Sequence, residues 1–279
     1  MAETAHRRVR PTRGPAGYIG GKRNLARRLV ARIEAIPHGL YGEPFMGMGG
    51  VFLRRRQAAA VEVLNDASTD VATLFRILQR HYEPFMDMLK WRLTSREEFQ
   101  RLLAAEPASL TDLERAARFL YLQRLAFGGK VVGRSFGVDR DGPGRFDVRK
   151  LGPLLEEIHE RLAGVVIERL DFEEFLRRYD RPDALFFVDP PYWGSEGDYG
   201  PTFARADFER LAAALHRLKG RFLLTINDRP ETRALFEGCS IEAVATTYSV
   251  GGGGGHRAGE IVVSTAGGAP GLGSAPGAR

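Results

Sequence analysis

Cysteine is almost absent from this chain, which has a single one, Cys239, among 279 residues. One cysteine excludes an intramolecular disulfide and argues against a thiolate metal cluster, and such usage is typical of a reducing compartment. No apolar run approaches the roughly 20 residues of a membrane-spanning helix. Residues 1–13 lack the apolar segment of a signal peptide. We therefore expect a cytoplasmic protein with no membrane contact, no signal peptide and no metal.

Hydrophobic residues make up 43% of the chain, which is ample for a globular core. The length suits one α/β domain with an insertion or two small domains. The formal net charge is +6, and most basic residues are arginines, which bind phosphate oxygens in pairs and stack on bases. This balance is compatible with a nucleic-acid partner, but many ordinary enzymes are equally basic.

The chain is organised around the tetrapeptide Asp189-Pro190-Pro191-Tyr192. The apolar run 184–188 before it predicts a buried strand of a parallel sheet. Two consecutive prolines cannot donate to a sheet, so the strand should end at Asp189, where ligands of open α/β sheets bind. A carboxylate, a rigid backbone carbonyl and a flat ring together suit a planar amine. The plainer interpretation is a proline turn beside an exposed acid.

Two glycine-rich segments point to a nucleotide site. The turn at residues 17–22 precedes a helix predicted over residues 23–36 and can hold an anion through backbone N–H groups and Lys22. A simple turn explains it equally well. Residues 40–53 are predicted to form a strand and a glycine loop, with a helix continuing to about residue 60.

Asp66 strengthens the second of these signals. It follows a strand predicted over residues 61–64 and lies 19 residues after Gly47. An acid about 20 residues after the glycine loop is placed to bind ribose hydroxyls. The alternative is that Asp66 caps the helix predicted over residues 68–79. The loop also lacks the third glycine of the dinucleotide fingerprint.

The rest of the chain divides by composition. Residues 1–14 are polar and basic and predict a disordered arm, and residues 266–279 predict a disordered tail. Residues 81–150 are predicted to be mainly helical and to carry a hairpin or long loop. Basic side chains interleaved there with Phe127 and Phe136 suit phosphate contact and base stacking. A flexible surface hairpin is the plainer interpretation.

Strands and helices alternate, and residues 241–250 and 260–264 predict an antiparallel pair around a glycine loop that we expect to be mobile. In this arrangement the chain resembles the DNA adenine-N6 methyltransferases of the Dam type, particularly phage and prophage members, over about residues 15–265. The motifs that carry the resemblance are, in order, Tyr18-x-Gly20-Gly21-Lys22, Glu43-Pro44-Phe45-x-Gly47-x-Gly49, Asp66, Asp171-Phe172 and Asp189-Pro190-Pro191-Tyr192.

The resemblance implies an α/β class I methyltransferase with a Rossmann-like, seven-stranded sheet. Residues 15–80 and 151–265 would form the catalytic domain, and residues 81–150 an inserted target-recognition subdomain with a DNA-binding hairpin. The implied reaction transfers the methyl group of S-adenosylmethionine to N6 of a flipped adenine in double-stranded DNA and releases S-adenosylhomocysteine. The setting would be restriction–modification or phage protection in a bacterial or phage-infected cell, and we expect a monomer or weak dimer.

The resemblance also implies roles for individual residues. The catalytic residues would be Asp189, Pro190, Pro191 and Tyr192. The donor site would comprise Tyr18, Lys22, Phe45, Gly47, Gly49, Asp66, Asp171, Phe172 and Asp189. The DNA contacts would be Arg124, Phe127, Lys130 and Arg134. Within the donor site, Lys22 would bind the donor's carboxylate and Asp66 its ribose. Asp171 and Phe172 would bind its adenine.

Residues 123–130 depart from the family pattern, because Dam-type enzymes typically have Asn-Gly in the hairpin. The recognition sequence is therefore left open. A cytosine-N4 or RNA amino-methyltransferase is one alternative, since the tetrapeptide suits any planar exocyclic amine. A Rossmann-type oxidoreductase would explain the glycine loop but not the tetrapeptide. A catalytically silent DNA-binding protein would leave the intact pocket unexplained.

Overall fold

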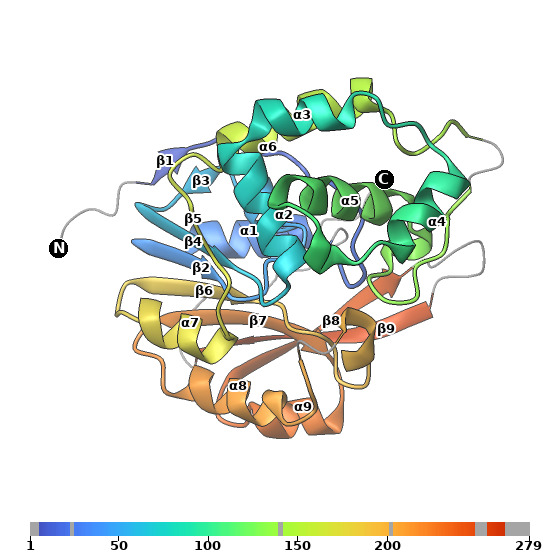
Figure 1. The fold of residues 1–279 in the computed structure, drawn as a ribbon. Coiled ribbons are helices and arrows are strands. Elements are labelled where there is room, and N and C mark those ends of the chain that lie inside the picture. The colour runs from blue at the N-terminus through green and yellow to red at the C-terminus, as the bar shows by residue number, and fades with distance from the viewer. Residues whose placement is uncertain (1–5, 23–24, 139–141, 201–202, 249–255, 266–279) are drawn as a thin grey trace, which may run out of the picture.

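A seven-stranded mixed sheet forms the centre of the computed structural model (Figure 1). The structure describes residues 6–22, 25–138, 142–200, 203–248 and 256–265. The strands of the sheet are β2 (Leu40–Glu43), β4 (Val61–Asn65), β5 (Val166–Glu168), β6 (Ala184–Val188), β7 (Arg221–Asn227), β8 (Ser240–Tyr248) and β9 (His256–Ser264). Their order is β5-β4-β2-β6-β7-β9-β8. The first five pair in parallel and β9 pairs antiparallel with both neighbours, which confirms the expected class I fold.

Helices cover both faces of the sheet. They are α1 (Ala26–Ala35), α2 (Thr69–Arg80), α3 (Tyr82–Leu89), α4 (Arg96–Ala104), α5 (Asp112–Leu125), α6 (Val148–Arg161), α7 (Phe172–Tyr179), α8 (Asp207–His216) and α9 (Pro230–Leu235). Short 3-10 turns are η1 (Phe52–Arg54), η2 (Pro107–Ser109), η3 (Phe127–Gly129) and η4 (Glu196–Tyr199). In Figure 1, α2, α3, α5 and α6 lie above the sheet and α7, α8 and α9 below it. Because β6 is covered on both faces, all of its side chains are buried and its sequence is continuously apolar.

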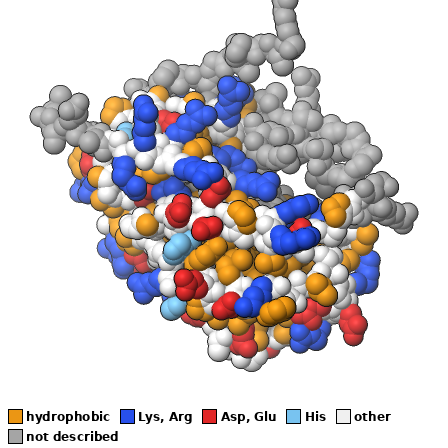
Figure 2. All heavy atoms as spheres, turned by 90° about the horizontal axis from the view of Figure 1, so that it is seen from above, with side chains coloured by type: hydrophobic (Ala, Val, Ile, Leu, Met, Phe, Trp, Pro, Cys, Tyr) orange, Lys and Arg blue, Asp and Glu red, His pale blue; other side chains and the backbone are white. Residues whose placement is uncertain are grey.

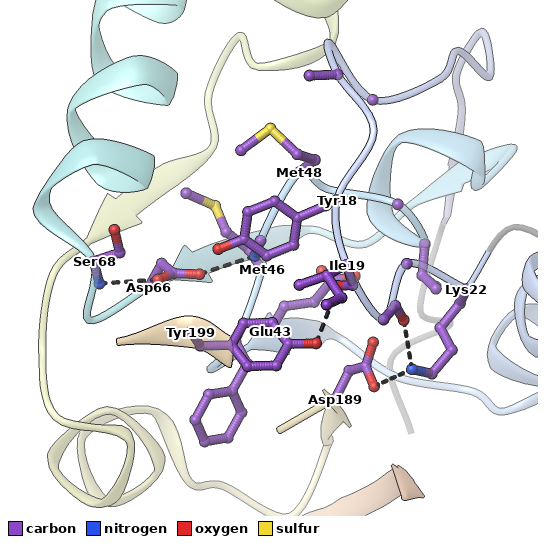
Figure 3. A pocket seen from close by; sticks show the side chains of 18 of the residues that line it. Tyr18, Ile19, Lys22, Glu43, Met46, Met48, Asp66, Ser68, Asp189 and Tyr199 are labelled. Atoms are coloured by element: carbon purple, nitrogen blue, oxygen red, sulfur yellow. Dashed lines mark hydrogen bonds and ion pairs between the residues drawn. The ribbon is translucent and has the colours of Figure 1, made fainter. Parts of the chain in front are cut away.

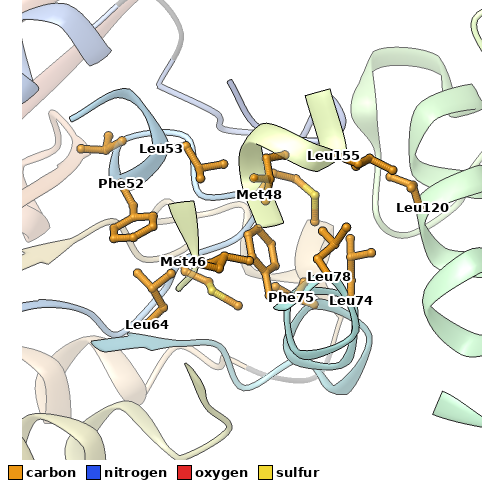
Figure 4. Close-up of a cluster of buried hydrophobic side chains, with 14 of the residues drawn as sticks. Met46, Met48, Phe52, Leu53, Leu64, Leu74, Phe75, Leu78, Leu120 and Leu155 are labelled. Atoms are coloured by element: carbon orange, nitrogen blue, oxygen red, sulfur yellow. The ribbon is translucent and has the colours of Figure 1, made fainter. Parts of the chain in front are cut away.

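The helices between β4 and β5 share their core with the sheet. Figure 4 shows Met46 and Met48 of the glycine loop beside Phe75 of α2, with Leu120 of α5 and Leu155 of α6 closing the same cluster. All five side chains are buried. The inserted helices therefore extend the main core. The division into a catalytic domain and a recognition subdomain stays a prediction.

The N-terminal segment differs from the expected disordered arm. β1 (Arg7–Arg8) pairs antiparallel with β3 (Gln57–Ala58). The hydroxyl of Thr12 donates to Glu157 Oε2 at 2.7 Å. The prediction is therefore wrong for residues 6–14, whose backbone and side chains find partners on the folded domain.

Local corrections concern two segments. The helix expected to reach residue 60 is only the turn η1, because the chain turns at Arg55, whose buried guanidinium donates to Glu62 Oε1 at 2.6 Å. The segment after α5, predicted as a hairpin or long loop, is a long loop with one isolated bridge, between Ala126 and Phe136, so the hairpin that the resemblance implied is not formed.

Some expectations fall on residues that the structure does not describe. The expected start of the first helix at residue 23, the glycine loop 251–255, the tail 266–279 and the first five residues of the expected arm lie outside the described residues. Among the residues that are described, no helix has the length and apolarity needed to cross a bilayer.

Candidate active site

A cavity of about 520 Å³ opens at the carboxyl ends of β2, β4 and β6 (Figure 3). Parallel strands end at the same edge of a sheet, so the residues that follow them meet there. Four of the five motifs contribute to the wall, through Tyr18, Lys22, Phe45, Gly47, Asp66, Asp189, Pro190 and Pro191. The structure thus brings together residues that are far apart in the chain.

Two donors hold the carboxylate of Asp189 after β6. Lys22 Nζ lies 2.7 Å from Asp189 Oδ1, and Thr225 Oγ1 of β7 donates to the same oxygen at 2.9 Å. Burial raises the pKa of Asp189, and the ammonium of Lys22 opposes that rise. Lys22 is itself buried, donates to Gly20 O at 2.9 Å and lies 4.6 Å from the centroid of the Tyr192 ring. Its contacts favour a role in holding Asp189, and the predicted contact with the donor's carboxylate stays a prediction.

Tyr192 is hydrogen-bonded to the antiparallel strand β9. Its hydroxyl donates to Glu260 Oε1 on β9. Glu260 is fully buried, and its other oxygen, Oε2, has no hydrogen-bond partner in the described part of the chain. Burial raises the pKa of this carboxyl. Sequence reasoning missed Glu260, whose only signal is a single acid directly before the apolar run 261–263.

A second buried acid, Glu43, ends β2 and lines the cavity (Figure 3). The hydroxyl of Tyr41 donates to Glu43 Oε1 at 2.6 Å. Burial raises the pKa of Glu43 to about 8. The carboxyl is therefore mostly protonated at neutral pH and offers the cavity a donor as well as acceptors. Sequence analysis included Glu43 in a motif but gave it no role.

Backbone amides bind both oxygens of Asp66. Gly47 N donates to Oδ2 and Ser68 N to Oδ1, each at 2.9 Å. Burial raises the pKa of Asp66 to about 6, against the effect of these amides. Gly47 has φ 49°, and a Cβ there would lie 3.2 Å from the Tyr18 ring, so the loop requires glycine. The N-cap of α2 is Ser68, which leaves Asp66 beside the glycine loop, as its spacing predicts.

Aromatic rings form another part of the wall. The ring centroids of Tyr18 and Tyr199 are 6.1 Å apart, and the Tyr199 hydroxyl donates to Ile19 O at 3.0 Å. Burial raises the pKa of both phenols. Phe45 and Phe203 meet edge to face at 5.7 Å between centroids. Sequence reasoning missed Tyr199 and Phe203, because their segment has no periodic pattern.

Of the predicted catalytic and donor-site residues, four lie outside the cavity wall, namely Gly49, Asp171, Phe172 and Tyr192. Phe172 packs behind Phe45, with 5.6 Å between the ring centroids. The exposed carboxylate of Asp171 caps α7 by accepting from Glu173 N at 2.9 Å, and it pairs with Arg210 at 2.9 Å. The structure therefore does not bring Asp171 into the cavity.

The four predicted DNA contacts fall into two groups. Phe127 is 43% exposed and Lys130 is also exposed, on the loop after α5. Arg124 lines the cavity, and Arg134 donates to another side chain within the protein. On the helical face seen in Figure 2, the described Lys and Arg side chains are interspersed with acidic and apolar ones. Among the residues described, no group of three His, Cys, Asp or Glu side chains is arranged to hold a metal ion.

Comparison with known proteins agrees with this geometry. Residues 18–250 match the family model described as "D12 class N6 adenine-specific DNA methyltransferase". The chain is 24% identical over 224 residues to the Type II methyltransferase M.CviBI of Paramecium bursaria Chlorella virus NC1A. This alignment covers 79% of this chain and 85% of that protein. It is 26% identical to the Type II methyltransferase M1.LlaDCHI of Lactococcus lactis subsp. cremoris, over 84% of this chain and 88% of that one. It is 27% identical to the DNA N-6-adenine-methyltransferase of Escherichia phage P1, over 89% of this chain and 35% of that one.

Proposed function

Because the chain belongs to the D12 class of N6 adenine-specific DNA methyltransferases, we propose that its cavity binds S-adenosylmethionine and presents an adenine of duplex DNA to the donor's methyl group. The family establishes the reaction, methylation of adenine N6 in DNA, and implies S-adenosylmethionine as the methyl donor. It favours adenine over the cytosine and RNA alternatives and sets the oxidoreductase interpretation aside. The observation that carries the assignment of the site is the Asp189 carboxylate at the end of β6, only 20% exposed and paired with buried Lys22, with Pro190 and Tyr192 directly after it in the chain.

The chemistry of the cavity fits the donor. Gly47, at positive φ, lets the backbone approach a ligand closely, and Asp66 keeps lone pairs for ribose hydroxyls beyond those used by the two amides. Phe45 and Phe203 offer ring surface for a purine. When bound, S-adenosylmethionine supplies an electrophilic methyl group on a sulfonium. The residues around it bind and orient it and keep water from the reacting atoms.

The target amine requires activation, because its lone pair is delocalised into the adenine ring. Asp189 and the Pro190 carbonyl would accept its two hydrogens and draw the nitrogen toward tetrahedral geometry. The N6–carbon bond then forms as the donor's sulfur–carbon bond breaks, and N6 releases one proton to solvent after it is methylated. Lys22 and Thr225 favour the ionised form of the Asp189 carboxylate, against the effect of its burial, and hold it in position. Most of the rate would come from positioning and from these fixed charges.

An adenine inside a duplex lies within the base stack, so it must be flipped to reach Asp189. Tyr192 would stack on the flipped base, held in place by Glu260. Phe127, which is exposed on the loop after α5, is suited to fill the space that the base leaves, and Lys130 to contact phosphate. We propose these as the DNA contacts of this chain.

The test is methylation of plasmid DNA in cells that express the protein, read by long-read sequencing for N6-methyladenine. The wild-type chain should methylate adenines in one short sequence context. Asp189→Ala and Asp189→Asn should lower the rate at least about 100-fold in a purified assay, since each removes the charge aimed at the amine. Asp87→Ala is the matched control, because Asp87 forms an exposed pair with Lys90 at 2.8 Å on α3.

The outcomes separate the competing assignments. Near-normal turnover of both Asp189 variants would refute the assigned pocket. Methylation of cytosine or RNA, detected by mass spectrometry of digested nucleic acid, would refute the adenine target. A folded protein that binds no S-adenosylhomocysteine would refute the donor site.

A further inference from the structure

Gln123, near the end of α5, connects two segments that face different ligands in the proposed function. We call residues 15–22 the donor segment and residues 127–137 the recognition loop. Gln123 is 1% exposed, and its Nε2 donates to Gly17 O at 2.9 Å and to Gly129 O at 2.7 Å. One buried amide therefore bonds to both segments at once.

The two segments also touch directly, backbone against backbone. Ile19 N donates to Gly129 O at 3.0 Å. Gly129 has φ 68°, and a Cβ there would lie 3.0 Å from Tyr18 N and 3.1 Å from Gly17 C. Contact this close requires glycine. The recognition loop cannot move without disturbing the hydrogen bonds that hold the donor segment.

Two arginines from the recognition region reinforce this junction. Arg134 Nη2 donates to Gln123 Oε1 at 3.1 Å, and its guanidinium lies 5.4 Å from the centroid of the Phe119 ring. Arg124 Nη1 donates to Pro15 O at 2.8 Å. Both were predicted to contact DNA; in the structure Arg134 joins the recognition loop to α5, and Arg124 joins α5 to the donor segment.

We propose that Gln123 is a positioning residue that couples DNA binding to methyl-donor binding. The inference rests on the proposed function, in which Phe127 and Lys130 of the recognition loop meet DNA and Tyr18 of the donor segment lines the donor cavity. A ligand that orders one segment also orders the hydrogen bonds between Gly17, Gln123 and Gly129. The second ligand then loses less conformational entropy when it binds. By linkage, each ligand raises the affinity for the other by the same factor.

The experiment measures that factor with non-reacting ligands. Calorimetry gives the Kd of S-adenosylhomocysteine without and with a short duplex that carries the methylated sequence context. Fluorescence anisotropy gives the Kd of the duplex without and with S-adenosylhomocysteine. For the wild-type chain we expect both ratios to agree at about 5-fold or more, which is the usual range of coupling between sites. Gln123→Ala should bring both ratios close to 1.

Two further variants separate coupling from a general loss of structure. Gln79→Ala is the matched control, since Gln79 Nε2 likewise donates to two carbonyls, Leu162 O at 2.8 Å and Val165 O at 2.7 Å. It should keep the wild-type factor. Gly129→Ala places a Cβ against the backbone of Gly17 and Tyr18 and leaves Gln123 unchanged, so it should also lower the coupling factor. This second variant keeps the test decisive if Gln123→Ala does not fold.

Wild-type ratios of 1, or a wild-type factor retained in folded Gln123→Ala or Gly129→Ala, would overturn the coupling. Either result leaves the proposed function standing, because both ligands still bind and DNA is still methylated. Failure of the proposed function is seen earlier, as absence of methylation or of S-adenosylhomocysteine binding to the wild-type chain.

Discussion

Replacing Lys22 by methionine tests whether its ammonium favours the ionised form of Asp189, the carboxylate that we propose binds the target amine. Lys22 Nζ and Asp189 Oδ1 are 2.7 Å apart, and their side chains are only 2% and 20% exposed. At that distance two unit charges attract by about 6 kcal/mol at an effective dielectric constant of about 20. Much of this attraction offsets the cost of burying both groups, yet removing one partner of a buried pair typically costs about 3–5 kcal/mol. In Lys22→Met the ionised form of Asp189 loses this stabilisation, so we expect the carboxyl to take up a proton more readily.

The assay is the rate of DNA methylation as a function of pH. Without the ammonium, burial acts unopposed and the pKa of Asp189 rises further. At neutral pH, Lys22→Met should therefore turn over at least about tenfold more slowly, corresponding to about 1.4 kcal/mol. Its rate should recover as pH increases, with the rising limb of the profile displaced to higher pH than in the wild-type chain. Lys22→Arg keeps the charge and should retain a profile close to wild type.

The same assay distinguishes two proposed roles of Lys22, holding Asp189 and binding the carboxylate of the methyl donor. If the ammonium instead bound the donor's carboxylate, Lys22→Met would raise the KM for S-adenosylmethionine and leave the pH midpoint of kcat unchanged. That result would refute the reasoning from the ion pair. Lys90→Met serves as a control, because Lys90 belongs to an exposed pair that should not affect the profile.

Three further predictions follow from the buried groups and the glycine loop. Tyr192→Phe leaves Glu260 Oε1 without its donor and should lower the free energy of unfolding by about 1–3 kcal/mol in urea titrations; unchanged stability would contradict the assigned bond. Burial raises the pKa of Glu43 to about 8 in the folded state, against an ordinary value of 4.5. Between pH 4.5 and 8 the folded chain therefore holds a proton on Glu43 that the unfolded chain has lost, so the free energy of unfolding should fall with increasing pH by up to about 1.4 kcal/mol per pH unit. Glu43→Gln should flatten that slope in denaturation measured from pH 5 to 8, and an unchanged slope would assign it to another group. Gly47→Ala forces a side chain into φ 49° against an aromatic ring and should weaken S-adenosylhomocysteine binding at least about tenfold by calorimetry, whereas wild-type affinity would show that the loop tolerates a Cβ.

The predictable parts of the site are those specified by local sequence. The apolar run before Asp189 and the two prolines after it act within a few residues, so the end of β6 could be placed from the sequence alone. The contact between Gly47 and Asp66 follows from the spacing of two parallel neighbouring strands, β2 and β4, whose carboxyl ends meet at one edge of the sheet. The antiparallel pair β8–β9 was recognisable from its two apolar segments.

The parts that could not be predicted depend on long-range packing. Nothing local shows that Glu43 and Glu260 are buried, since their neighbours would suit an exposed strand end equally well. Arg124 carries the same charge whether it faces DNA or the cavity, and only the position of α5 against the donor segment decides between them. The N-terminal strand β1 pairs with residues about 50 positions away, a partner that charge and composition do not indicate.

The continuous core described above has a consequence for altering which DNA sequence is methylated. Leu120 of α5 and Leu155 of α6 share one core cluster with Met46 and Met48 of the glycine loop, so α5 and α6 are not a module that can be exchanged whole between relatives. A graft would have to begin after Arg124, because Gln123 and Arg124 both donate to backbone carbonyls of the donor segment. Within the loop, the exposed side chains are free to be randomised, whereas Gly129 should be kept. In the proposed function, a library built on that rule would vary the DNA contacts and leave the residues of the cavity unchanged.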